Sequence, residues 1–256
     1  MARKIVIASG KGGVGKTTIA VHIGCYLASR GARVVLCDGD FGLNNADLLL
    51  GVESKSAYDV VDVIEGRCRA KQALVRCPQS PNLFLLCSNR SEPERFVSAQ
   101  SLKIVLEGLS PLFDFILIDA PSGLGDGFHR AASVAEEGLV ITTPQVTALR
   151  DADKTVSALK NYRLKSVSII VNRVEGERLV KGEIVSPQQI GELLRVPVFG
   201  VVPEIGALGG QGTVRHRAFT TLGKNLLTGE KKLYDPSKKY QGFFGGVRRV
   251  MKEFLS

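Results

Sequence analysis

The chain has 256 residues, 44% hydrophobic content and a formal net charge of +9, which suits one large α/β domain attracted to an anionic partner: nucleic acid, membrane surface or nucleotide. Its five cysteines are irregularly spaced and include no C-x-x-C pair, which argues against a disulfide framework and a zinc site and favours a reducing compartment. No run reaches the roughly 18 apolar residues of a membrane span, and the first residues lack a signal-peptide pattern, so we expect a cytoplasmic protein.

Short apolar segments that predict β-strands recur along the whole chain. They are 4–8 (KIVIA), 33–37 (RVVLC), 83–87, 113–118 (FDFILI), 138–142, 167–171 and 198–202. Helical patterns lie at 16–29, 101–109, 146–162 and 187–194. Because the strands are apolar throughout rather than alternating, we expect a mostly parallel sheet with helices on both faces, a doubly wound α/β fold. Ligands in such sheets bind beyond the carboxyl ends of the strands.

The first strand runs into SGKGGVGKTT, residues 9–18, which has the spacing G-x-x-x-x-G-K-[ST] of a phosphate-binding P-loop. Glycines let backbone N–H groups surround phosphate oxygens, and the following helix adds partial positive charge at its N-terminus. Lys16 is expected to reach the β- and γ-phosphates, and the Thr17 hydroxyl to bind Mg²⁺. The expected nucleotide contacts in this loop are Gly10, Lys11, Gly12, Gly13, Val14, Gly15, Lys16, Thr17 and Thr18.

Three aspartates follow predicted strands at the same edge of the sheet. Asp119 ends the strand FILID, where a carboxylate would hold the metal or its water shell; a loop start or a helix cap is the alternative. Asp38 and Asp40 follow the second strand, and carboxylates near a γ-phosphate can position the attacking water or contact metal-bound water. We assign the water to Asp40 and the metal to Asp38 and Asp119, while helix capping remains open for either residue of the pair.

These motifs carry a resemblance to a known family. The loop with its early Lys11 resembles the deviant Walker A loop of the ParA/MinD family of ATPases. The similarity continues through DGDFGLNNADLLLG, AYDVVDVIEGRCRAKQAL, ILIDAPSG, ITTPQVTALRDADKT, VNRV and GFFGGVRRVMKEFL, and so covers essentially the whole chain. Among members of the family, YDVVDVIEG and TALRDAD resemble most the proteins that determine the septum site.

The resemblance implies an ATPase that uses ATP and Mg²⁺ and forms a homodimer on ATP. Lys11 is similar to the signature lysine that reaches the partner's ATP, Lys16 serves its own subunit, and Asp40 resembles the residue that activates water. The adenine side would be formed by Asn172, Arg173, Pro203 and Glu204. An asparagine amide suits the edge of adenine, although Asn172 could equally be a strand-end turn residue.

Residues 242–256, GFFGGVRRVMKEFLS, predict a separate C-terminal element. Apolar residues recur at helical spacing with basic residues mostly on the other face, which is typical of a helix lying in a membrane interface. A terminal helix docked on the body of the domain would bury the same stripe and is the alternative. We expect an ATPase domain over 1–237 and a membrane-targeting tail over 238–256. The expected membrane contacts are Phe243, Phe244, Val247, Arg248, Arg249, Val250, Met251, Phe254 and Leu255.

The resemblance also implies a function and partners. The protein would place the division septum from the inner face of the cytoplasmic membrane and recruit a MinC-like division inhibitor that restrains FtsZ assembly. A MinE-like or equivalent topological regulator would stimulate hydrolysis, and anionic lipids rather than DNA would be the charged partner. The alternatives are a flagellum-placing ATPase of the same family, a ParA-type DNA-partitioning ATPase, and a nucleotide-gated scaffold with negligible turnover.

Overall fold

The computed structural model describes residues 1–39, 45–53, 55–88, 97–206 and 215–241. Asp40 and the predicted membrane contacts in 242–256 lie outside these described residues. Within them, eight strands form one sheet in the order β3-β4-β2-β5-β1-β6-β7-β8. All neighbours pair in parallel except β3 with β4. The strands are β1 (Arg3–Ala8), β2 (Val34–Asp38), β3 (Leu74–Arg76), β4 (Leu83–Leu86), β5 (Phe115–Asp119), β6 (Glu137–Thr142), β7 (Ser166–Val174) and β8 (Val198–Pro203).

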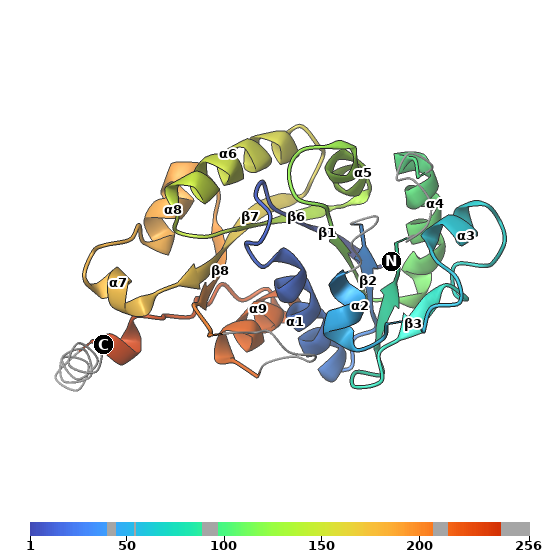
Figure 1. Ribbon diagram of the computed structural model, residues 1–256, viewed down its shortest axis with the longest axis horizontal. Coiled ribbons are helices and arrows are strands. Elements are labelled where there is room, and N and C mark those ends of the chain that lie inside the picture. The colour runs from blue at the N-terminus through green and yellow to red at the C-terminus, as the bar shows by residue number, and fades with distance from the viewer. Residues whose placement is uncertain (40–44, 54, 89–96, 207–214, 242–256) are drawn as a thin grey trace.

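Helices cover both faces of this sheet (Figure 1). The helices are α1 (Lys16–Ser29), α2 (Asn45–Leu50), α3 (Val60–Ile64), α4 (Ala99–Leu109), α5 (Asp126–Val134), α6 (Val146–Lys160), α7 (Gly176–Val180), α8 (Pro187–Leu194) and α9 (Arg217–Thr228), with short 3₁₀ turns η2 (Ser110–Leu112) and η3 (Lys238–Tyr240). On one face lie α4, α5, α6 and α8, and on the other lie α1, α2 and α9 (Figure 1). None of the helices described here is long and apolar enough to cross a membrane.

The predicted doubly wound α/β fold is confirmed, and alternation along the strands explains its two cores. In β1, Ile5 and Ile7 join the cluster under α1 and α9, whereas Val6 and Ala8 join the cluster under α4, α5 and α6. Successive side chains of a strand point to opposite faces, so a strand covered on both sides has to be apolar at every position. All five residues of β2 and all five of β5 are buried in this way.

Most predicted elements lie within three residues of their observed bounds, and the misses have physical causes. Strand β3 has three residues and pairs antiparallel at the edge of the sheet, too short to produce a pattern in the sequence. Helix α9 contains Thr220, Thr221 and Gly223, residue types that lower helix propensity. It forms because its apolar face, including Phe219 and Leu222, packs against the sheet and α1.

The sheet topology brings the predicted site residues to one edge. Strand β1 lies between β5 and β6 in the middle of the sheet, with β6, β7 and β8 toward one edge and β5, β2, β4 and β3 toward the other. Asp38 at the end of β2 is in register with Asp119 at the end of β5, and Ile7, beside the end of β1, is also in register with Asp119. The phosphate loop, Asp38 and Asp119 therefore meet at the carboxyl ends of neighbouring strands.

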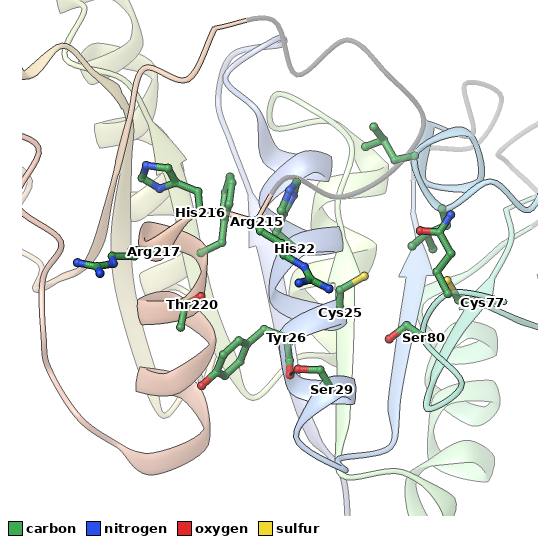
Figure 2. A pocket seen from close by; sticks show the side chains of 14 residues that line it. His22, Cys25, Tyr26, Ser29, Cys77, Ser80, Arg215, His216, Arg217 and Thr220 are labelled. Atoms are coloured by element: carbon green, nitrogen blue, oxygen red, sulfur yellow. Dashed lines mark hydrogen bonds between the residues drawn. The ribbon is translucent and has the colours of Figure 1, made fainter.

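Close packing between α1 and α9 requires a glycine at position 223. The ring of Tyr26 on α1 extends toward α9 (Figure 2), and a Cβ on Gly223 would fall on that ring. We expect Gly223→Ala to lower the free energy of unfolding by about 1–3 kcal/mol, because the ring has to leave its packed position. The measurement is urea denaturation.

The control for that prediction is Gly108→Ala on the exposed side of α4, where an added Cβ meets nothing within 4 Å. This change should leave stability unchanged or raise it by up to about 1 kcal/mol, because alanine has the higher helix propensity. If both variants shifted stability equally, the contact between Tyr26 and Gly223 would not be the cause.

Candidate functional site

The loop between β1 and α1 is rich in glycine, so mainly its backbone groups are available to a ligand. Gly13 and Gly15 have φ of 75° and 92°, in the left-handed region that favours glycine. Gly15 is also the N-cap of α1 and provides no side-chain cap, so the first N–H groups of the helix are left for another acceptor. A Cβ on Gly10 would fall on the backbone of Asp151, which packs α6 directly against the loop. This arrangement fits a phosphate group held by backbone N–H donors.

The predicted phosphate lysine and the predicted metal carboxylate form a buried ion pair. Lys16 Nζ lies 3.0 Å from Asp119 Oδ1, and the two side chains are 7% and 1% exposed. Lys16 is the first residue of α1 and Asp119 the last of β5, the strand that pairs with β1. Buried charges require a partner of opposite sign, so without nucleotide each of these two groups neutralises the other.

Asp38 contacts the start of α2, as the helix-capping alternative for this residue predicted. Its carboxylate is 3% exposed, and Asp38 Oδ2 accepts a hydrogen bond of 3.4 Å from the backbone N–H of Ala46, at the start of α2. Its predicted role as a metal ligand remains a prediction. Thr17 and Thr18 are half-buried in the first turn of α1, and Thr17 keeps its predicted role as a Mg²⁺ ligand.

Lys11 lies on the outer side of the loop and contacts α6. It is exposed, and its Nζ lies 3.4 Å from Thr147 Oγ1 in the first turn of that helix. Sequence reasoning missed the contacts of the loop with Thr147 and Asp151. Both residues lie in the segment TALRDAD, which resembles the family, but this segment alone does not indicate which side of α6 faces the loop.

The predicted adenine-side residues separate into two groups. Arg173, with φ 56°, and Glu204 line a cavity of about 350 Å³ together with residues 143–146, and Pro203 is buried at the end of β8 beside them. Asn172 is 8% exposed and donates from Nδ2 to the carbonyl oxygen of Val14 in the phosphate loop, at 2.8 Å. The structure thus brings Arg173 and Glu204 to one cavity and Asn172 to the loop.

A larger cavity of about 640 Å³ lies between α1, α9 and the turn that connects β3 to β4 (Figure 2). None of the predicted site residues lines it. Cys25 lies in its wall, and burial raises the pKa of this thiol to about 12, so it is protonated and unreactive at neutral pH. Cys25, Cys37, Cys68 and Cys77 are free thiols. This cavity therefore adds no residue to the predicted site.

Comparisons with known proteins bear on this site. Residues 5–209 match the family model described as CobQ/CobB/MinD/ParA nucleotide binding domain. The septum site-determining protein MinD of Synechocystis sp. is 41% identical over 204 residues, 80% of this chain and 77% of that protein. The chain in an Aquifex aeolicus MinC:MinD cell division protein complex has a TM-score of 0.74 and 33% identity, covering 98% of this chain and 96% of that one. MinD of Pyrococcus horikoshii complexed with Mg-ADP has a TM-score of 0.75 and 27% identity, covering 89% and 97%.

Proposed function

The chain belongs to the MinD family of ATPases, and we propose that it positions the division septum as an ATP-dependent switch on the membrane. It would bind ATP with Mg²⁺, dimerise, attach to anionic lipids through residues 242–256 and recruit a MinC-like inhibitor. Hydrolysis, stimulated by a MinE-like or equivalent regulator, would release it.

The observation that carries this proposal is the buried pair of Lys16 and Asp119 at a loop in which Gly10 and Gly15 leave no room for a Cβ. Phosphate oxygens would accept from the loop backbone and from Lys16. Thr17 and Asp119 would hold Mg²⁺, with Asp38 adjacent, and the cation would neutralise charge on the β- and γ-oxygens. Asp40, which lies outside the described residues, keeps its predicted role of positioning the attacking water.

Two relatives support the nucleotide and the partner. The Pyrococcus horikoshii MinD was obtained with Mg-ADP, and the Aquifex aeolicus protein in a complex with MinC. We propose the same nucleotide and the same kind of inhibitor for this chain. The homodimer is proposed because the loop has a second lysine. Lys16 already occupies the position next to Asp119, so Lys11 is available for the partner's nucleotide.

Residues 235–241, the tail root, precede the proposed membrane contacts and pack on the body of the domain. Ser237 is 6% exposed and its Oγ donates to Asp235 Oδ1 and accepts from Gln241 Nε2, at 2.6 and 2.7 Å. Gly176 at the start of α7 packs so closely on Pro236 that a Cβ would fall on the carbonyl oxygen of Pro236. Helix α7 follows β7, which carries Arg173, one of the residues predicted to contact adenine. Lys238 and Lys239 in the tail root are exposed.

The energetics of such a tail favour membrane binding by a dimer. Each basic residue near an anionic surface contributes about 1 kcal/mol, and each buried Phe or Met contributes about 1.5–3 kcal/mol at best. Ordering the tail costs about 1 kcal/mol or more per residue, so one tail would bind weakly. Two linked tails would gain roughly 10²- to 10⁴-fold through effective concentration.

Co-sedimentation with anionic liposomes in ATP, ADP or no nucleotide tests this proposal. We expect pelleting of the full chain with ATP only, and none for a chain that ends at Gln241. That end point keeps Tyr240 and Gln241, which belong to the packed tail root. Equal pelleting in every nucleotide state would contradict the switch. Pelleting with duplex DNA but not with liposomes would favour the DNA-partitioning alternative.

A further inference from the structure

Asn172 makes a contact that recognition of a base does not explain. It lies near the end of β7, and Val14 lies in the phosphate loop, 158 residues earlier in the chain. The amide is 8% exposed and Val14 is 5% exposed, so both ends of the hydrogen bond are shielded from water. A carbonyl oxygen can only accept, so this contact requires the N–H₂ group of the side chain and fixes its orientation.

The geometry of the loop gives this hydrogen bond a consequence for phosphate binding. The peptide joining Val14 to Gly15 is trans and planar, so its N–H and C=O point in opposite directions. When Asn172 holds the Val14 carbonyl, the N–H of Gly15 is directed away from β7. Asn172 Nδ2 also lies where a Cβ of Gly15 would have to be, which keeps side chains out of this turn.

We propose that Asn172 is a positioning residue for the phosphate loop: its amide holds the peptide between Val14 and Gly15 in the orientation that presents the Gly15 N–H to the phosphates. The opposite orientation would turn the Val14 carbonyl oxygen toward a bound phosphate, where two acceptors repel each other. The inference rests on the proposed use of this loop for phosphates. It assigns Asn172 a contribution to every polyphosphate ligand, independent of the base.

The test is Asn172→Asp, a substitution of nearly equal size that replaces the amide donor with a carboxylate acceptor. Calorimetry would measure affinities of the full chain for ADP, GDP and inorganic tripolyphosphate. We expect all three to fall by a similar factor, about tenfold to a hundredfold, because each depends on the same peptide orientation. If ADP affinity fell while tripolyphosphate affinity stayed unchanged, Asn172 would recognise the base rather than position the loop, and the inference would be wrong.

A pH series provides a readout that a general loss of structure would not produce. Burial raises the pKa of an introduced carboxyl group, and its neutral form has an O–H that can again donate to Val14. The affinity of the variant for tripolyphosphate, relative to the unmodified chain, should therefore recover between about pH 8 and about pH 5.5. A ratio that stays constant with pH would contradict the proposed hydrogen bond.

Asn225→Asp is the matched control, because Asn225 is 3% exposed and its Nδ2 donates to the carbonyl oxygens of Phe199 and Lys232. It removes the same kind of donor away from the loop and should leave tripolyphosphate affinity within about twofold of the unmodified chain. An equal loss in both variants would show that destabilisation is the cause. If the unmodified chain bound neither nucleotide nor tripolyphosphate, the proposed function would fail and this inference with it.

Discussion

Replacing Lys11 with alanine is expected to spare folding and ADP affinity while abolishing ATP-dependent dimerisation and stimulated hydrolysis. Lys11 is exposed and its ammonium lies beside Thr147, so its loss should change the free energy of unfolding by no more than about 0.5 kcal/mol. The lysine predicted to bind phosphate within the same subunit is Lys16, which pairs with Asp119 and which the substitution leaves untouched. In the proposed dimer Lys11 stabilises the transition-state charge in the partner's site, and cations that act in this way contribute about a thousandfold or more to the rate.

Lys154→Ala is the control for this prediction. Lys154 is exposed on α6 and lies 3.9 Å from Asp151, the residue that packs on Gly10, without itself belonging to the loop. Analytical ultracentrifugation with a non-hydrolysable ATP analogue measures dimerisation, and phosphate release in the presence of liposomes and the regulator measures stimulated hydrolysis. A Lys11→Ala chain that dimerised and hydrolysed ATP like the control would refute the assignment of Lys11 to the partner's nucleotide.

Features that depend on strand ends were predictable from the sequence. Continuous apolar runs identified seven of the eight strands in the described residues, and parallel strands place their carboxyl ends at one edge. This rule placed Lys16 and Asp119 at the same edge, whereas their ion pair also depends on the pairing of β1 with β5, which the apolar runs did not predict. The glycine loop could be located because its spacing is a local property of the chain.

Contacts between segments far apart in the chain could not be predicted. The hydrogen bond from Asn172 to Val14 depends on how β7 lies relative to the loop, and nothing in VNRV indicates it. The packing of Asp151 on Gly10 likewise depends on the position of α6. For Asp38, capping and metal binding use the same carboxylate at the same strand end, so spacing alone could not separate them. These tertiary contacts position the site, whereas the groups predicted to bind phosphate belong to the local motif of residues 9–18.

The largest stability effect is expected from breaking the buried pair of Lys16 and Asp119 in the absence of nucleotide. Lys16→Met and Asp119→Asn each remove one member of this ion pair and leave the other charge at a position that is 1–7% exposed. Each single change should lower the free energy of unfolding by about 3–5 kcal/mol. The double variant removes both charges and should cost much less than the sum of the two, as measured in a double-mutant cycle by urea denaturation. Additive losses would show that the two groups do not depend on each other.

The same variants separate stability from nucleotide binding. In the proposed nucleotide complex, Lys16 would exchange Asp119 for phosphate oxygens, and Asp119 would exchange Lys16 for Mg²⁺. Asp119→Asn removes the carboxylate that competes for Lys16, so its affinity for ADP without Mg²⁺ should not fall, whereas Lys16→Met should lose about tenfold or more. Hydrolysis with Mg²⁺ should fall in both, since one variant lacks the phosphate cation and the other the metal carboxylate. If Asp119→Asn also lost ADP affinity without Mg²⁺, the pair would be a fixed structural unit rather than two charges that exchange partners when the nucleotide binds.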